Sequence, residues 1–557
     1  MQVKATIRNL ILSLFPLAIK AQTTYLFQDS KEGILLERME VKAQRDSVLN
    51  FSKIHPYSRK QVVPRIAALD NLLQSPSDRY LYASALMASP EWTSVAHARY
   101  RSRKPTWKHF YKTPANLVEV DQPDFFLVIN PAFQYTVAKE QNNTQYLFQN
   151  SRGAHIRGRI ANRIGFAGYV GENQERDPLY VQSWVAERKA LPGQGYYQAF
   201  KKTAYDYFDA RGYISFNATK YIDVSFGYDR NSIGNGLRSL YLSDFPNNAL
   251  FLRLNTRIWK FNYQNLFMEL QHADPLDPRQ RDYLLGKKYA AMHHLDMALT
   301  PWLNVGLFES VVFGRTNKFD FSYLNPIIFM RSMEQQNGSG DNSMAGIDFK
   351  ANAARRFQFY GQLLFDEFKL SEVRDNKGWW ANKWGWQLGA KYIDVLGVPN
   401  LDLQVEVNRV RPFTYSHDDS VANYTHYNQP LAHPLGANFQ EVLMQLRYQP
   451  KPRWTVLAKG MYYFQGRDSA KVSSGSNIFL PNVPPYRKQD YGYSVGNGVR
   501  TDVTLASLLL SYELKQNLYL EACALFRNEK AAGRQSQHTT VLSAGIRWNM
   551  WRRSFLF

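Results

Sequence analysis

The sequence predicts an all-β transmembrane protein: an antiparallel outer-membrane β-barrel of about eighteen strands (16–18), preceded by a small, partly helical N-terminal region in the periplasm. Segments after residue 120 alternate apolar and polar side chains, as strands with one lipid face and one water face do. Short and long connections also alternate along the chain, as in a barrel with short periplasmic turns and long outward loops. No stretch after the N-terminus reaches the ~18 to 20 apolar residues of a spanning helix.

The first residues predict export. Lys4 and Arg8 precede the apolar run 10–15, and Ala21 ends the segment before Gln22. This order is typical of a signal peptide over residues 1–21, and an amphipathic N-terminal helix is the alternative. Cleavage would lower the formal net charge from +21 to +18, because Lys4, Arg8 and Lys20 are lost.

Residues 22–120 differ from the rest of the chain. The segments 32–46 and 62–73 have helical periodicity, with Ile66, Leu69, Leu72 and Leu73 on one face of the second. Helices at the periplasmic end of a barrel would form a plug or a docking bundle. A flexible leader is the alternative.

Residues 121–557 contain the predicted barrel. In the segment 401–408 every odd position is apolar and every even position is polar. Tight links are expected near residues 217–221, 257–260, 300–302, 354–356, 449–453 and 515–517. The predicted strands are 125–135, 153–160, 163–171, 211–218, 221–229, 249–257, 260–270, 288–298, 303–313, 346–354, 356–366, 384–392, 401–410, 438–448, 453–464, 501–513, 517–528 and 538–550.

Aromatic residues make up 15% of the chain, which excludes disorder. Many lie at predicted strand ends, where a barrel carries its interfacial girdles, among them Trp259, Trp302, Trp548 and Trp551. Phe557 is placed like the C-terminal aromatic residue of many outer-membrane barrels. Ordinary core packing is the alternative for any single one of these residues.

Enzyme chemistry finds little support, and no cofactor is expected. The chain lacks a nucleophile elbow, a His-Glu-x-x-His zinc motif and a phosphate-binding loop. The neighbouring His293 and His294 lie in a predicted strand and point to opposite faces, so they cannot bind one metal together. Cys523 is the one cysteine, which excludes an intrachain disulfide and Cys-based metal sites.

Several short segments of the chain are similar to the motifs of a known family. The run 227–244, which contains Asn231, Gly234, Asn235 and Gly236, resembles the signature that follows a barrel strand in Wzi-like capsule-assembly proteins and RemB-like gliding-motility proteins of the Bacteroidota. Residues 55–59 (His-Pro-Tyr-Ser-Arg) are similar to the same family, and so are 323–329, 341–342 and 346–348. The resemblance covers nearly the whole mature chain.

The resemblance implies a surface lectin of the outer membrane that attaches capsular polysaccharide or assists its assembly. The signature supplies the candidate ligand-binding residues: Asp229, Arg230, Asn231, Asn235, Arg238 and Asp244. Arg230 and Arg238 offer planar forks to the carboxylates of acidic sugars. Alternatively, Arg230, Arg238 and Asp244 pair with one another or with Asp229, which would fold the loop into the lumen and close it.

The positive charge suits anionic partners, namely lipopolysaccharide phosphates and an acidic surface polysaccharide. Arg253, Arg257, Lys260 and Lys459 could instead neutralise carboxylates across the lumen. The export signal and the strand pattern argue against nucleic acid. Two other functions stay open from the sequence: a gliding-motility or secretion accessory that binds motility or secretion proteins, and a porin-like channel or transporter.

Overall fold

The computed structural model describes residues 24–26, 30–93, 100–102, 109–272, 285–315, 318–327, 329–338, 340–469 and 472–557. The predicted signal peptide lies outside these residues. Within them, no helix is long and apolar enough to cross a membrane.

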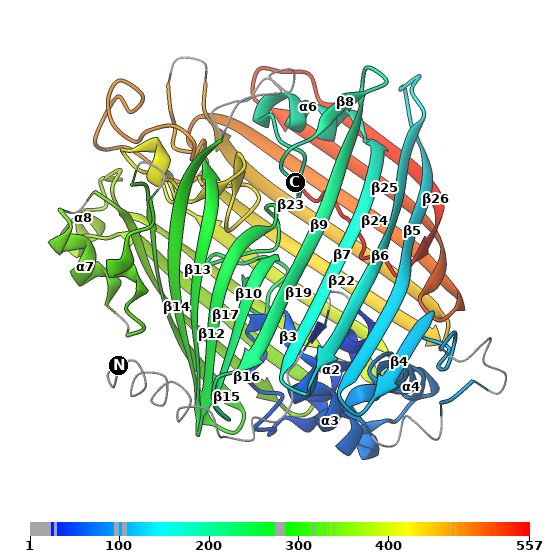
Figure 1. Cartoon of the computed structure of the whole chain (residues 1–557). Helices are drawn as coiled ribbons and strands as arrows, with labels where there is room; N and C mark the ends of the chain where they lie inside the picture. Colours follow the sequence, from blue (N-terminus) through cyan, green and yellow to red (C-terminus); the bar gives the residue numbers. More distant parts are fainter. Residues whose placement is uncertain are drawn as a thin grey trace, which may run out of the picture.

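Eighteen antiparallel strands close into one barrel (Figure 1), which confirms the predicted fold and strand number. Each strand pairs with the next along the chain, and the last strand pairs with the first, with Trp548 opposite Phe133. The wall consists of β5 (Phe125–Glu140), β6 (Leu147–Ile160), β7 (Ile164–Arg176), β9 (Ala204–Asn217), β10 (Ile222–Asp229), β12 (Ala249–Ile258), β13 (Phe261–His272), β14 (Gly286–Thr300), β15 (Leu303–Phe313), β16 (Asn342–Ala353), β17 (Phe357–Glu367), β18 (Lys383–Tyr392), β19 (Leu401–Val410), β22 (Phe439–Lys451), β23 (Trp454–Arg467), β24 (Val499–Lys515), β25 (Leu518–Ala531) and β26 (Gln537–Trp548). The short strands β4 (Val118–Gln122) and β8 (Gln198–Phe200) pair along β5 and β9.

The alternation predicted for residues 401–408 is present in β19, but its polar side chains are the buried ones. Asp402, Gln404, Glu406 and Asn408 face the lumen and are almost inaccessible, whereas Val405 is exposed on the outside. The lumen face is buried because other parts of the chain fill the barrel.

The six tight links predicted from the sequence all lie at one end of the barrel, and the long loops emerge at the other. In single-chain outer-membrane barrels the short turns face the periplasm. The longer connections carry α6 (Leu179–Arg188), α7 (Met330–Gln336) and α8 (Leu370–Asp375).

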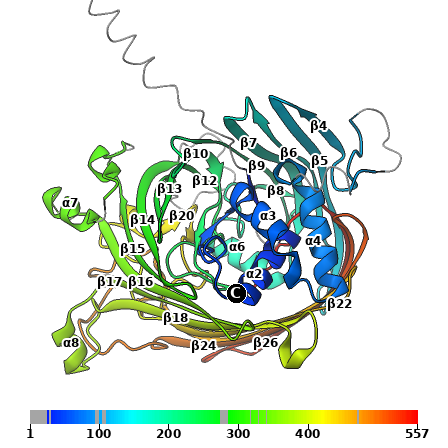
Figure 2. The same cartoon turned by 90° about the horizontal axis from the view of Figure 1, so that it is seen from below.

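Three helices lie at the end with the short turns, inside the outline of the barrel (Figure 2): α2 (Lys31–Ala43), α3 (Arg59–Ala68) and α4 (Pro76–Ala88). The first two match the predicted helical segments, while α4 was not predicted. Its N-terminus carries a recognisable signal, because the Ser75 hydroxyl accepts a hydrogen bond from the Asp78 amide and a proline occupies the first turn. Leu35, Leu36, Met39, Ile66 and Leu81 form the core between the helices.

Buried ion pairs attach these helices to the wall, so the region is docked rather than a loose leader. The Arg38 guanidinium reaches Asp78 on α4, Asp394 in the turn after β18 and Asp402 on β19. Lys31 Nζ lies 2.6 Å from Glu513 Oε1 of β24. Each cation pairs with a carboxylate that is itself withdrawn from water.

The prediction of an aromatic girdle holds for only some of the residues that it named. Trp259 and Trp302, 78% and 38% exposed, lie in short turns where the girdle was expected. The girdle prediction was wrong for Trp551, and Phe557 does not take the place of the C-terminal aromatic residue of outer-membrane barrels, because the segment after β26 turns back into the lumen. Trp551 contacts Tyr169 there, and Phe557 is buried against Tyr180 and Trp184.

Candidate functional site in the lumen

The signature segment enters the barrel instead of extending outward. Ile233, Leu240, Tyr241 and Leu242 are buried, and the Tyr241 ring stacks on Phe308 of β15 at 4.3 Å. We call residues 230–248 the plug. Tyr415, Tyr424 and Leu431 from the loop 411–438 join the same apolar cluster. The plug therefore forms a hydrophobic core with inward-facing strand residues.

The plug is also bonded to the N-terminal region, which brings two of the family-like motifs together. β11 (Ser232–Ile233) pairs with β2 (Ile54–His55) inside the barrel. The Gly234 amide donates to the Lys53 carbonyl at 2.7 Å, and the Asn235 side chain donates to the Ser52 carbonyl at 3.1 Å. Gly234 has a φ of 139°, which glycine adopts readily. The side-chain amide of Asn235 is therefore engaged with the N-terminal region.

Glu406 of β19 holds the next residues of the plug. Its carboxylate accepts hydrogen bonds from the Leu237 amide at 2.7 Å and the Arg238 amide at 3.1 Å. A side chain at Gly236 would place its Cβ 2.5 Å from the same carboxylate. Glycine is required here because the backbone passes so close to Glu406.

Most other candidate site residues also have partners within the protein. Arg238 pairs with Glu441 of β22 at 3.1 Å, rather than with Asp229 or Asp244. Asn231 accepts a hydrogen bond from Arg253 at 2.8 Å, and the Asp229 carboxylate accepts one from the Arg230 amide at 2.8 Å. The loop is thus folded into the lumen, as the alternative interpretation expected. Arg230 contacts the expected Asp229 and Asp244, whereas the partner of Arg238, Glu441, was not indicated by the sequence.

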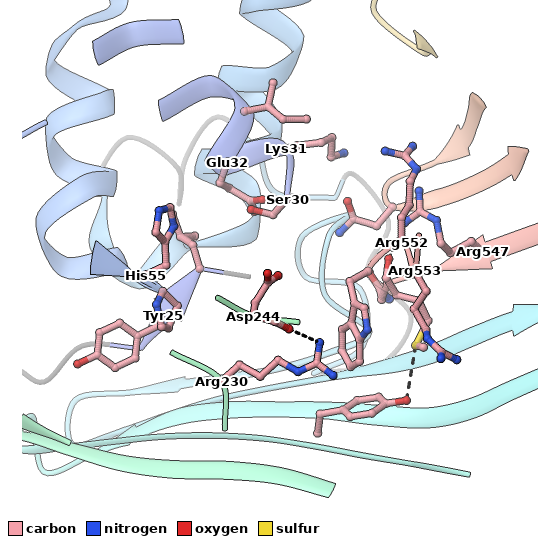
Figure 3. A pocket seen from close by; sticks show the side chains of 18 of the residues that line it. Tyr25, Ser30, Lys31, Glu32, His55, Arg230, Asp244, Arg547, Arg552 and Arg553 are labelled. Atoms are coloured by element: carbon pink, nitrogen blue, oxygen red, sulfur yellow. Dashed lines mark hydrogen bonds between the residues drawn. The ribbon is translucent and has the colours of Figure 1, made fainter. Parts of the chain in front are cut away.

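A cavity of about 430 Å³ separates the plug from the N-terminal helices. Five of the six candidate residues line it, and Asn235 does not. The described part of its wall contains twelve basic and four acidic side chains: Lys31, Arg59, Arg157, Arg211, Arg230, Arg238, Arg447, Arg453, Lys459, Arg547, Arg552 and Arg553, against Glu32, Asp229, Asp244 and Glu513. Figure 3 shows Arg547, Arg552 and Arg553 across the cavity from Tyr25 and His55, with Arg230 and Asp244 between them.

Carboxylates behind the wall compensate several of these cations. Arg547 and Arg552 both pair with Glu521, at 2.7 and 2.9 Å, and Arg553 pairs with Glu175. Burial opposes the charge of Arg553, but Glu175 and its neighbours outweigh burial and raise its pKa. The carboxylates thus fix the directions of these three side chains.

Arg230 differs from the other arginines of the cavity. Its two terminal nitrogens donate to backbone carbonyls, of Asp244 at 3.2 Å and of Gly193. Its buried Nε has no hydrogen-bond partner among the described residues. Burial and the neighbouring Arg211 lower its pKa to about 10, so it is still protonated at neutral pH. Arg230 is therefore a cation that an added anion would stabilise.

Sequence reasoning missed a buried ion pair in the lumen, between Lys53 and Asp348. Lys53 Nζ lies 2.5 Å from Asp348 Oδ1 and 2.9 Å from Asp296 Oδ1, directly below the plug. Asp348 belongs to the family-like stretch 346–348, so the motif was noticed without its partner. Two of the lumen cations named from the sequence have neutral hydrogen-bond partners: Arg253 bonds to Asn231, and Arg257 bonds to Gln61 and two backbone carbonyls.

The two neighbouring histidines lie on opposite faces, as predicted. His293 pairs with Glu309 at 2.9 Å, and His294 pairs with Asp348 at 2.8 Å. Among the described residues, no group of three or more His, Cys, Asp or Glu side chains is arranged to hold a metal ion.

His426, in β20 (Thr425–His426), should make the loop 411–438 sensitive to acid. Its Nδ1 accepts from the Gln271 amide at 2.9 Å, so Nε2 carries the proton that it donates to the Asn248 carbonyl at 2.9 Å. Burial, assisted by Lys288, lowers the pKa of His426 to about 4, against ~6.5 in an unfolded chain. The neutral ring is thus favoured by folding. Its contribution to stability is complete above pH ~6.5 and is lost as the pH falls toward 4.

Between pH 7 and 4.5 we expect this histidine to account for a loss of about 2 to 3 kcal/mol in the free energy of unfolding. The His426→Gln variant should lack that part of the pH dependence. Urea unfolding at both pH values measures it, with the variant as the control for every other titrating group. Equal pH dependence in both proteins would contradict the assignment.

Comparison with known proteins gives two kinds of result. The chain is similar in fold to Wzi of Escherichia coli, an outer membrane protein involved in group 1 capsule assembly and a carbohydrate-binding β-barrel. The two structures match with a TM-score of 0.56 and 13% sequence identity, over 95% of this chain and 100% of that chain. OprD of Pseudomonas aeruginosa matches with a TM-score of 0.42 and 11% identity over 81% of this chain and 97% of that chain. No curated protein matches the chain. The family model of the capsule assembly protein Wzi matches residues 149–513, about two thirds of the sequence, and the chain therefore belongs to that family.

Proposed function

We propose that this outer-membrane barrel is a non-catalytic surface protein that attaches capsular polysaccharide or helps to assemble it. Its family membership supports the capsule role. The observation that supports recognition of an acidic sugar is the excess of basic over acidic side chains around the cavity, together with the unsatisfied Nε of Arg230. A carboxylate of a uronic acid matches the geometry and charge of a guanidinium.

The proposal assigns the six candidate residues to three tasks: ligand contact, support of that contact and attachment of the plug. Arg230 is the ligand contact. Asp229 holds its backbone amide and Asp244 holds its side chain at the cavity wall, while the neighbouring Asn231 is held by Arg253 of β12. Arg238 and Asn235 fasten the plug through Glu441 and Ser52. Lipopolysaccharide phosphates remain a proposed partner for basic side chains outside the lumen.

Arg230→Gln should weaken binding of a glucuronate oligosaccharide at least ten-fold, because one charge-assisted hydrogen bond contributes about 1.5 to 3 kcal/mol. Calorimetry on the detergent-solubilised protein measures the affinity. Arg534→Gln is the matched control, since Arg534 is exposed in the turn between β25 and β26. Equal affinities in the two variants would contradict the role of Arg230.

Deletion of the gene tests the role in the cell. Surface polysaccharide should be lost from the cells and appear in the medium, and the intact gene should restore retention. If the capsule stays attached while spreading on agar fails, the motility alternative is favoured. Liposome swelling addresses the channel alternative, for which the plug predicts no permeation by sugars.

A further inference from the structure

One part of the outer barrel wall is covered by the protein itself. Phe267, Ala291 and Val311 neighbour the lumen-facing Met268, Ala290 and Val312 on their strands, so they point outward. They are nevertheless buried, beneath Tyr323 and Met330 of the connection between β15 and β16. Figures 1 and 2 both place α7 of this connection outside the wall. We call residues 318–327 and 329–338 the outer flap.

The flap covers polar groups that would otherwise face lipid. His293 of β14 and Glu309 of β15 form a pair at 2.9 Å on the outward register. The Glu309 carboxylate also accepts hydrogen bonds from the Phe329 amide at 2.8 Å and the Met330 amide at 3.0 Å. The flap thus satisfies a carboxylate that would be costly in contact with hydrocarbon.

The position of Glu309 along its strand sets the depth of the flap. Glu309 is the seventh residue of β15. At ~3.3 Å per residue and a tilt of about 40°, it lies about 15 Å above the periplasmic end of the strand. The apolar band of such barrels is about 25 Å tall. The flap therefore reaches down into the outer half of that band.

The exposed part of the flap carries three large apolar side chains beside polar ones, among them Asn325, Ser332 and residues 335–337. Phe321, Ile327 and Phe329 are 78%, 69% and 71% exposed. Lys318 and Arg331 are exposed in the same segment. On the wall beside the flap, Leu307 and Ile347 are exposed on the outward register and belong to the ordinary lipid-facing surface.

We propose that the outer flap is embedded in the outer leaflet, with Phe321, Ile327 and Phe329 among the acyl chains and Lys318 and Arg331 at the headgroups. Its depth in the apolar band and its continuity with the lipid-facing wall select lipid as the occupant. The flap adds a layer outside the wall on one side of the barrel. It holds the loop between β15 and β16 in the membrane instead of leaving it in the extracellular space.

Spin labels test the proposal. Cys523 is half-buried on β25, so Cys523→Ser gives a background for the single-cysteine variants Phe321→Cys and Phe329→Cys. Nitroxide labels at these positions, with the protein in phosphatidylcholine nanodiscs, should collide more often with oxygen than with a water-soluble nickel chelate. Tyr146→Cys is the control, because Tyr146 is 77% exposed in the loop between β5 and β6; its label should prefer the nickel chelate.

Two outcomes would overturn the proposal. Labels at Phe321 and Phe329 that are as accessible to the nickel chelate as the label at Tyr146 would place the flap in water. Labels shielded from both reagents would show that protein, such as a second copy, covers the flap. Photoactivatable phosphatidylcholine with a diazirine in its acyl chain gives an independent reading on the unmodified protein: crosslinks should map to residues 318–338, and their absence there, with crosslinks elsewhere on the barrel, would contradict embedding.

Discussion

Replacement of Lys53 by methionine is expected to lower the free energy of unfolding by about 3 to 5 kcal/mol. Lys53 is 2% exposed and pairs with Asp296 and Asp348, whose side chains are 1% and 4% exposed. Burial opposes its charge, but the two carboxylates outweigh burial and raise the pKa of Lys53. Methionine fills the same space without a charge, so both carboxylates would stay buried without their cation.

Lys53 also lies where the N-terminal region meets the plug, because its backbone carbonyl accepts a hydrogen bond from the Gly234 amide. Loss of the buried ion pairs should therefore weaken the attachment of the N-terminal region to the plug. Urea unfolding in lipid vesicles, followed by tryptophan fluorescence, measures the loss. Lys369→Met is the control: its Nζ lies 3.2 Å from Glu372 and its side chain is 57% exposed, so a change within about 0.5 kcal/mol is expected. A similar small effect at Lys53 would show that the buried pairs do not hold the region in place.

Replacement of Glu406 by alanine should detach the plug from β19. The carboxylate is fully buried and accepts from Leu237, Arg238 and the Tyr360 hydroxyl, the last at 2.9 Å. Alanine leaves these donors unsatisfied, at about 1 to 3 kcal/mol each. We expect a total loss of about 3 to 5 kcal/mol and at least ten-fold faster hydrogen exchange at the Leu237 and Arg238 amides.

Hydrogen exchange measured by mass spectrometry distinguishes local opening of the plug from a lower stability of the whole barrel. If only the plug opens, exchange in β19 itself should change less than exchange in the plug. Glu406→Gln keeps one carbonyl acceptor and should show a smaller effect. Glu187→Ala serves as the surface control, since that side chain is 68% exposed and lies 3.5 Å from Arg188. Unchanged protection of the plug amides in Glu406→Ala would refute the role of Glu406.

Together these contacts describe a barrel whose interior is a folded core rather than a water channel. The plug, the loop 411–438 and the segment after β26 all enter the lumen. This arrangement leaves a cationic cavity between the plug and the N-terminal helices, and it explains why the family-like residues are mostly engaged with the protein itself. Glycines 234 and 236 serve a close backbone approach, not a mobile ligand loop.

The barrel and its strand number could be read from the sequence because alternation within a strand is a local pattern with a period of two. Residues 401–408 reveal their two faces without knowledge of any neighbour. Helix α2 was also predictable from local periodicity. Helix α4 was missed although Ser75 and Pro76 mark its start, because its apolar positions give a weaker pattern than those of α2.

Only the tertiary structure decided where the loops lie. The sequence identified 227–244 and His55 as related motifs, but their pairing depends on contacts between residues about 180 positions apart. It placed Trp551 in a membrane girdle and likened Phe557 to the C-terminal aromatic residue of outer-membrane barrels, because an aromatic side chain near a strand end suits an interface or a core equally well. The outer flap was hidden for the same reason: Phe321 and Phe329 have no periodic pattern, and their position outside the wall follows from packing against β13, β14 and β15. Local periodicity thus determined the barrel, and long-range packing determined what fills and surrounds it.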